Sequence, residues 1–288
     1  MSEPKPGTVE VDAQFLPGCG EPAQPARYRV VREDALTLDV EGVGHYTLMW
    51  TPISGQPTAQ GFTVEDGVLG DVDDPEALAL ALGFARSEGL IGSLEDIRAL
   101  SLCPDDPGVV RVQLRDPAAT AVNRRNVVVN SSCGICGPRE ILEENALGLA
   151  SVSDNLRLSR EQLTPLMTAM RDAQQVFEET GGSHAAALFD TAGLISVAED
   201  LGRHNALDKA IGRVLIERGD STGYGAVLSS RLSLEMVLKA IRAGIELVLA
   251  VSAPTSLAIE VAERFGVTLC GFVRDDRATV YTHPRRIT

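Results

Sequence analysis

Residues 226–273 decide the fold class and read AVLSSRLSLEMVLKAIRAGIELVLAVSAPTSLAIEVAERFGVTLCGFV. Short, mostly apolar runs at 226–229, 247–251 and 269–273 have the length of β-strands, and the middle run is apolar throughout, which is typical of a strand buried on both faces. The two stretches between these runs carry apolar residues at helical spacing. Strand and helix therefore alternate at short intervals, which predicts a layered α/β domain with a largely parallel sheet and right-handed crossovers.

The residues that flank this segment extend the same pattern. Residues 185–189 and 194–198 predict two strands around a turn, a helix follows them, and residues 278–281 predict the last strand. Upstream, an apolar stripe at residues 163–177 predicts one helix that ends at Gly181 and Gly182.

The first half of the chain has a different character. Residues 75–88 predict a helix, because Pro75 suits a first turn and Gly89 can end it. Residues 54–74 are rich in Gly, Pro and Asp and predict a loop or an added hairpin. Together with the predicted strands, this helix indicates a smaller, β-rich α+β domain. The strands are predicted at 28–31, 36–40, 46–50 and 110–114.

Prolines crowd the N-terminus, at Pro4, Pro6, Pro17, Pro22 and Pro25. This spacing predicts a mobile tail without regular structure. The chain then divides into four expected parts: a mobile tail at 1–26, an N-terminal β-rich α+β domain at 27–130, a mobile loop and linker at 131–150, and a C-terminal layered α/β domain at 151–288.

The 288-residue chain has a formal net charge of −14 at pH 7, from 26 Lys and Arg against 40 Asp and Glu. This acidity argues against a nucleic-acid partner, which requires clustered cations. No membrane partner is expected either, because a bilayer-spanning helix needs about 20 consecutive apolar residues. The start MSEPKPGTVEVDAQF lacks the order of a signal peptide, and an odd number of cysteines, five, fits reduced thiols. We therefore expect a cytoplasmic protein.

The sharpest chemical feature is the pair Cys133 and Cys136, within SSCGICGP at residues 131–138. The surrounding glycines and proline place it on a loop. A thiol is a nucleophile only as the thiolate, which nearby backbone N–H groups favour. Four interpretations stay open on these residues alone: metal binding, dithiol redox chemistry, a persulfide relay, or a loop without chemistry. No structural metal is expected, because structural zinc usually needs four ligands and one close cysteine pair supplies two.

Basic side chains gather where strands are predicted to end. Ligands of open α/β sheets bind beyond the carboxyl ends of strands, where helix N-termini also attract anions. His204 lies at such a junction, where a polar turn with Asn205 as N-cap is an equally good explanation. His184 lies between a helix end and a strand, a position where a lone histidine is more often structural. Four arginines at element ends would together form a pocket for a multiply phosphorylated ligand: Arg203, Arg231, Arg274 and Arg277.

Several separate motifs over most of residues 95–288 form a familiar set: CGICG at 133–137, GGSHAAALFD at 181–190, EDLGRHNALDKAIG at 199–212, LSSRLSLEMVLKAIRAGI at 228–245, AVSAPTSLAIEVAERFGVTLCGFVR at 250–274 and VYTHPRRI at 280–287. Together they resemble the FdhD/NarQ family, the formate dehydrogenase accessory sulfurtransferases. LALGFARSEGLIGSLEDI at 80–97 also resembles this family.

The resemblance implies a function. It implies that the chain takes persulfide sulfur from a cysteine desulfurase and transfers it to the bis-guanine-dinucleotide molybdenum cofactor, its bound substrate, which formate dehydrogenase requires. It also implies a homodimer and a cytidine-deaminase-like fold for the C-terminal domain. The deaminase zinc signature, H-x-E with a later P-C-x-x-C, is absent, so deaminase chemistry is not expected.

The resemblance also assigns residues. Cys133 matches the persulfide-bearing cysteine and Cys136 its partner. The stretch that matches the cofactor contact comprises Phe272, Val273, Arg274, Asp275, Asp276 and Arg277. By location we add four pocket residues: His184, Arg203, His204 and Arg231. The chain departs from the family pattern at residues 54–74, which separate the strand ending in MWTP from the helix.

Two functions from other classes stay open. One is a chaperone that binds and delivers the molybdenum cofactor without sulfur chemistry, which predicts nucleotide binding without a persulfide and tolerance of cysteine loss. The other is a zinc-stabilised redox protein, which predicts bound zinc.

Overall fold

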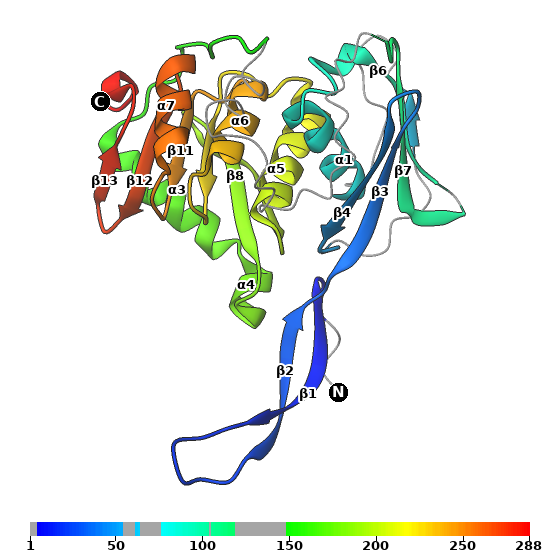
Figure 1. Cartoon of the computed structure of the whole chain (residues 1–288). Coiled ribbons are helices and arrows are strands. Elements are labelled where there is room, and N and C mark those ends of the chain that lie inside the picture. The colour runs from blue at the N-terminus through cyan, green and yellow to red at the C-terminus, as the bar shows by residue number, and fades with distance from the viewer. Residues whose placement is uncertain (1–4, 54–60, 64–75, 104, 119–147) are drawn as a thin grey trace.

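The computed structural model describes residues 5–53, 61–63, 76–103, 105–118 and 148–288. Two β-sheets face each other across a layer of helices, and a two-stranded ribbon projects from this body (Figure 1). Within the described residues, no helix has both the length and the apolar character needed to cross a membrane. The mixed α/β class predicted from the sequence is confirmed.

The larger sheet has the strand order β13-β12-β11-β10-β8-β9. β10, β11 and β12 are parallel, and the other three pairings are antiparallel. The expectation of a largely parallel sheet is therefore wrong, because the β8–β9 and β12–β13 hairpins flank the parallel core. The strands are β8 (His184–Asp190), β9 (Gly193–Asp200), β10 (Gly225–Leu228), β11 (Leu247–Ala250), β12 (Thr268–Arg274) and β13 (Arg277–Val280).

Helices cover both faces of this sheet. Ala187, Val227 and Leu249 belong to the apolar cluster on the side of α3 (Arg160–Asp172), whereas Leu188 and Val248 face the opposite core. All four residues of β11 are buried, which confirms the prediction of a strand covered on both faces. The helices on the opposite side are α5 (Arg203–Arg218), α6 (Leu234–Arg242) and α7 (Ser256–Phe265).

The single helix predicted over residues 163–177 is in fact two helices. α3 ends at Asp172, and α4 (Gln175–Thr180) begins after a break. The carboxylate of Glu199 accepts the backbone N–H groups of Val176 and Phe177, each at 2.9 Å. An acceptor from a distant strand thus satisfies the first donors of α4 and lets a new helix begin there.

The second sheet has the order β4-β3-β7-β6-β5 and lies in the first half of the chain. α1 (Glu76–Ser87) packs between this sheet and α5, and one apolar cluster includes side chains from both sheets. β5 lies within residues 54–74, and the rest of that stretch lies outside the described residues. The strands are β3 (Asp34–Val40), β4 (Gly44–Trp50), β5 (Gly61–Thr63), β6 (Ile97–Cys103) and β7 (Asp106–Leu114).

The close contact between α1 and α5 depends on two glycines. A Cβ atom on Gly83 of α1 would overlap the carbonyl oxygen of Asp208, and one on Gly212 of α5 would overlap that of Ala79. The two helices therefore approach each other through bare backbone, and each glycine is required by the opposing main chain.

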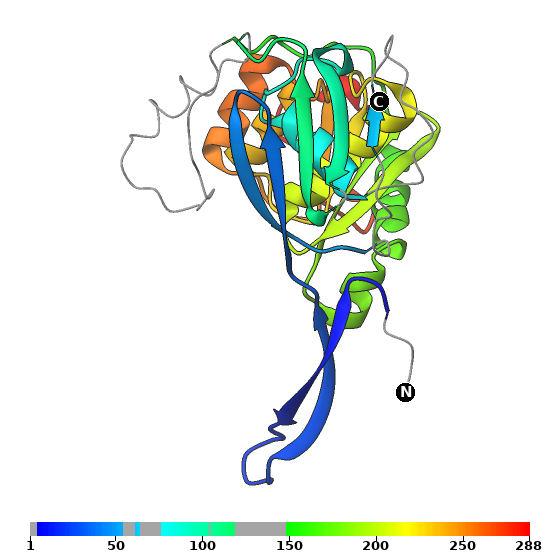
Figure 2. The same cartoon turned by 90° about the vertical axis from the view of Figure 1, so that its right-hand side faces the viewer.

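The prediction of an irregular tail at 1–26 is wrong. β1 (Thr8–Phe15) pairs antiparallel with β2 (Gln24–Val31), and the two form the ribbon that projects from the body (Figure 2). Pro17 and Pro22 lie in the loop that joins the strands, and Pro25 occupies the second position of β2, so the prolines leave most of the pairing intact. Lys5 and Arg29 form ion pairs with Glu179 of α4, which fix the base of the ribbon to the body.

Candidate functional site

The carboxyl edge of the parallel strands collects ten of the predicted site residues. β10, β11 and β12 end at this edge, whereas the antiparallel β8 begins there. His184 opens β8 and pairs in register with Asp200, the last residue of β9. The directions of the strands bring the other predicted residues to the same edge. Arg203 and His204 open α5, Arg231 follows β10, and Phe272–Arg277 lie at the end of β12 and in the β12–β13 turn.

A first group of these residues lies where α5 and α6 begin. His204 Nε2 is 3.0 Å from Glu235 Oε2, and Arg203 Nη2 is 4.0 Å from the same oxygen. The hydrogen bond from His204 holds the pKa of Glu235 below its ordinary value. Burial, together with the positive charges of Arg203 and His204, lowers the pKa of His184. His184 is therefore neutral at pH 7, beside a cationic group.

Ser229, directly after β10, connects this group to the sheet. Its Oγ accepts the Ala185 N–H at 2.9 Å and lies 3.4 Å from His184 Nδ1. Arg203 Nε is buried, and no acceptor in the described part of the chain reaches it. Arg231, two residues after Ser229, is exposed. The first group thus presents more hydrogen-bond donors than its own acceptors satisfy.

The second group is the β12–β13 turn. Phe272, Asp275 and Asp276 have φ angles of 54°, 49° and 55°, a left-handed conformation that costs energy in residues other than glycine. Phe272 is 41% exposed, which is unusual for an aromatic side chain. Val273 is buried against the α3 side of the sheet, so its side chain faces the core rather than a ligand.

The two groups lie on opposite sides of the ends of β10 and β11. Three strand spacings separate β8 from β12, which corresponds to about 14 Å. A cavity of about 310 Å³ adjoins the second group and is lined by Arg160, Thr164, Asp276 and Arg277 among others. Of the four arginines predicted to share one pocket, only Arg277 lines this cavity. The four arginines lie at the same edge of the sheet but do not line one pocket. A ligand that contacts both groups therefore has to be elongated.

A buried charge network supports the turn before α5, after which Arg203 and His204 begin the helix. Lys209 Nζ, fully buried, lies 2.8 Å from Asp200 Oδ2 and 2.8 Å from Glu76 Oε1, and it donates to the Thr51 carbonyl at 2.7 Å. Asp200 Oδ1 in turn accepts from Gly202 N and Asn205 Nδ2. The network joins the end of β4, α1 and the start of α5.

The sequence did not reveal these supporting residues. The N-cap of α5 is Gly202 rather than Asn205, which lies inside the helix. A second buried cation, Lys239 of α6, lies 2.8 Å from Asp208 Oδ2 and 2.7 Å from Glu88 Oε1. Lys209 and Lys239 each interrupt an apolar stretch of a helix. A charged residue in such a stretch is the sequence signal that could have indicated a buried ion pair. Glu235, the acceptor of His204, carried no sequence signal.

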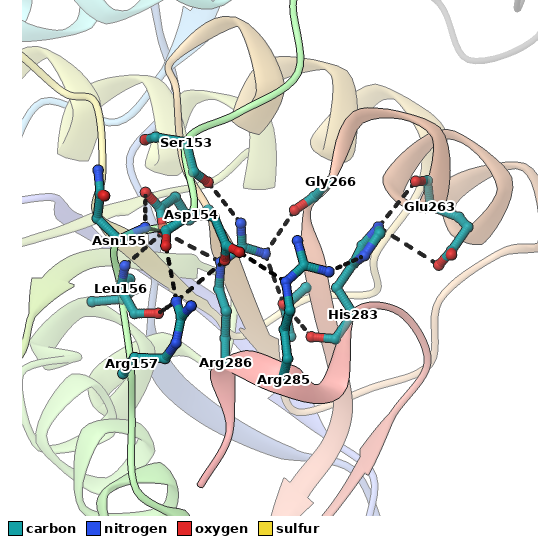
Figure 3. Close-up of polar contacts among 12 residues, drawn as sticks. Ser153, Asp154, Asn155, Leu156, Arg157, Glu263, Gly266, His283, Arg285 and Arg286 are labelled. Carbon is teal, nitrogen blue, oxygen red and sulfur yellow. Dashed lines mark hydrogen bonds and ion pairs between the residues drawn. The ribbon is translucent and has the colours of Figure 1, made fainter.

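The motif VYTHPRRI has a structural role (Figure 3). Arg286 is fully buried; its Nη2 donates to the Ser153 carbonyl at 2.6 Å and its Nη1 to the Gly266 carbonyl at 2.7 Å. Its Nε lies 3.1 Å from Asp154 Oδ1 and 3.3 Å from Glu246 Oε2. These contacts fasten the C-terminal segment to the chain before α3, at the edge opposite the candidate site.

Cys133 and Cys136 lie outside the described residues. Of the other cysteines, Cys19 is exposed and Cys103 and Cys270 are buried. Burial raises the pKa of the Cys270 thiol to about 12, so it is inert. Among the described residues, no group of three or more His, Cys, Asp and Glu side chains could hold a metal ion. Since the CxxC pair is not among them, the expectation of no structural metal stays a prediction.

Comparisons with known proteins agree on one family. A sequence model described as the FdhD/NarQ family matches residues 75–288. A protein of Sulfurisphaera tokodaii named sulfur carrier protein FdhD is 44% identical over 266 residues, which cover 92% of this chain and 89% of that protein. A protein of the same name from Bordetella bronchiseptica is 39% identical over 262 residues, which cover 90% and 87% of the two chains.

A crystal structure shows the same fold. It is that of a protein from Desulfotalea psychrophila proposed to be a formate dehydrogenase accessory protein, and it superposes with a TM-score of 0.73 at 23% sequence identity. The superposition covers 98% of this chain and 100% of the other.

Proposed function

Because this chain belongs to the FdhD/NarQ family, we propose that it is a sulfur carrier in the maturation of formate dehydrogenase. In this proposal it accepts persulfide sulfur from a cysteine desulfurase and passes it to the bis-guanine-dinucleotide molybdenum cofactor. The observation that carries the proposal is the Cys133–Cys136 pair, in a chain whose relatives are named sulfur carriers.

The transfer follows the rules of thiol exchange. The Cys133 thiolate attacks the terminal sulfur of the desulfurase persulfide, so that a new sulfur–sulfur bond forms on Cys133 and the desulfurase cysteine leaves as a thiolate. The Cys136 thiolate then attacks the inner sulfur of the Cys133 persulfide. This step forms a Cys133–Cys136 disulfide and releases hydrosulfide to the molybdenum, and a cellular dithiol reduces the disulfide before the next cycle.

The carboxyl edge is the proposed binding surface for the cofactor. The cofactor is long and carries pyrophosphate groups, and the two groups of edge residues, about 14 Å apart, suit a ligand of that shape. Arg203 in the first group and Arg274 and Arg277 in the second supply cations for phosphate oxygens, and the His204 ring lies beside Arg203. Phe272 offers an exposed aromatic face for a base.

The test is transfer of radiolabelled sulfur from a cysteine desulfurase to the purified protein. We expect labelling of the wild type, loss of labelling when Cys133 and Cys136 are both replaced by alanine, and full labelling of the matched control Cys19→Ala, because Cys19 is exposed but lies on the ribbon. Full labelling of the double variant, with undiminished activation of formate dehydrogenase, would favour the delivery chaperone instead. The homodimer and the cytoplasmic location stay predictions, which the mass in solution and cell fractionation can test.

A further inference from the structure

The hydroxyl group of Ser229 lies between two nitrogen atoms of β8. Its Oγ is 2.9 Å from the Ala185 backbone nitrogen and 3.4 Å from His184 Nδ1. The first contact has one possible direction, because a backbone N–H can only donate, so Oγ is the acceptor there. In the second contact, which atom donates depends on which ring nitrogen of His184 carries the proton.

Counting protons and acceptors assigns the tautomer. A serine hydroxyl has one proton to donate, and in the described part of the chain His184 Nδ1 is the acceptor within its reach. If Nδ1 carried the ring proton, the hydroxyl would accept twice and its own proton would have no partner. A partly buried donor without a partner is costly, so the favourable arrangement leaves Nδ1 bare and puts the ring proton on Nε2.

The Nε2–H group of His184 then faces a site that lacks an acceptor. No described residue accepts from Nε2, and the neighbouring Arg203 Nε is also without an acceptor among the described residues. The carboxylate of Glu235 is already bonded to His204. The buried Arg203 Nε without an acceptor, beside the half-buried His184 ring, favours an anionic oxygen as the missing partner.

We propose that Ser229 is a positioning residue, which fixes His184 as the neutral Nε2–H tautomer so that this N–H donates to a phosphate oxygen of the bound guanine nucleotide. The inference rests on the proposed function for the identity of the nucleotide. The role of Ser229 itself rests on its two hydrogen bonds. A neutral histidine donor adds a hydrogen bond of fixed direction beside the charge of Arg203.

The test combines nitrogen NMR of the four histidines with a GDP titration. The spectrum of His184, assigned by its absence from His184→Gln, should show the Nε2–H tautomer in the wild type. Ser229→Ala should mix the two tautomers and weaken GDP binding roughly three- to tenfold. Ser229→Thr, which keeps the hydroxyl, should restore both. Ser230→Ala is the matched control, since the Ser230 hydroxyl bonds only to the Arg231 carbonyl among the described residues, and it should change neither.

Three results would overturn the inference: an Nδ1–H tautomer in the wild type, a tautomer that Ser229→Ala leaves unchanged, or GDP binding that is absent or equal in both proteins. None of them bears on persulfide formation, which is measured on Cys133 and Cys136. Absent GDP binding would also contradict the proposed cofactor surface, whereas the two tautomer results and equal GDP binding would overturn this inference alone, so the two failures are separable.

Discussion

Lys209 Nζ lies 2.8 Å from Asp200 Oδ2, and neither side chain is exposed to solvent. The pair joins the second turn of α5 to the end of β9, and it holds the short turn after which Arg203 and His204 begin the helix. The candidate site is thus built on a charge pair that a ligand does not need to touch.

Lys209→Met should destabilise the protein strongly. The substitution removes the cation from beside the buried carboxylates of Asp200 and Glu76, and removal of one partner of a buried pair costs about 3–5 kcal/mol. Urea unfolding measures the loss. Arg264→Gln, at an exposed position on α7, is the control and should unfold almost as the wild type does. Equal stability of the two variants would contradict the structural role of Lys209.

Gly212→Ala should separate α1 from α5. The new methyl group would overlap the Ala79 carbonyl, and overpacking of this kind costs about 1–3 kcal/mol or more, because the obstacle is backbone. Thermal unfolding followed by circular dichroism measures it. Gly18→Ala is the matched control: nothing lies within 4 Å of a Cβ there, so we expect little change. A Gly212→Ala protein with the wild-type unfolding temperature would show that the helices are not in close contact.

Glu246 should make stability depend on pH in the acid range. Burial alone would raise the pKa of Glu246, but hydrogen bonds from Ser153, Asn155 and Leu156 and the charge of Arg286 outweigh it, and the pKa lies below the ordinary value of 4.5. A folded-state pKa below the unfolded one gives stability that is present above pH 4.5 and is lost as the pH falls through the folded value.

The variant Glu246→Gln tests this pH dependence. It should be less stable than the wild type at pH 7 by at least about 1 kcal/mol, and the difference should narrow as the pH falls below 4.5. Denaturant titrations at a series of pH values measure both. Glu263→Gln is the control, because the Glu263 side chain is 63% exposed. A difference that stays constant with pH would contradict the assignment.

Arg274→Ala should weaken binding of a guanine nucleotide. Arg274 ends β12 at the carboxyl edge, and loss of a charged hydrogen bond to phosphate reduces affinity roughly tenfold. Isothermal titration with GDP measures it. Arg264→Ala is the matched control, since Arg264 lies in the last turn of α7, which runs back to the other edge of the sheet. If both variants bind GDP equally well, the cofactor does not bind at the β12–β13 turn.

Local periodicity predicted most of the described elements from α3 onward, because alternation and helical spacing are properties of neighbouring residues. It did not predict the break between α3 and α4, which depends on Glu199 of a distant strand. Proline content alone does not indicate the ribbon, because the strand register leaves Pro17 and Pro22 in a loop where they do not interrupt pairing. β6 was missed for lack of a strong pattern.

The sequence predicted those site residues that lie where strands end, because strand ends can be recognised in the sequence. Strand-to-helix junctions indicated Arg203, His204 and Arg231, and strand directions bring all three to one edge. The roughly 14 Å between the two groups follows from strand order, which no local pattern encodes. Lys209 and Glu76 are 133 positions apart in the chain, and their contact appears only when α1 packs on α5.

The most direct measurement of sulfur carriage is the intact mass of the protein after incubation with a cysteine desulfurase and cysteine. A wild-type adduct of one sulfur atom that a thiol reductant removes, absent when Cys133 and Cys136 are both alanine, is the predicted result. An unmodified wild type, or the same adduct on the double variant, would contradict it.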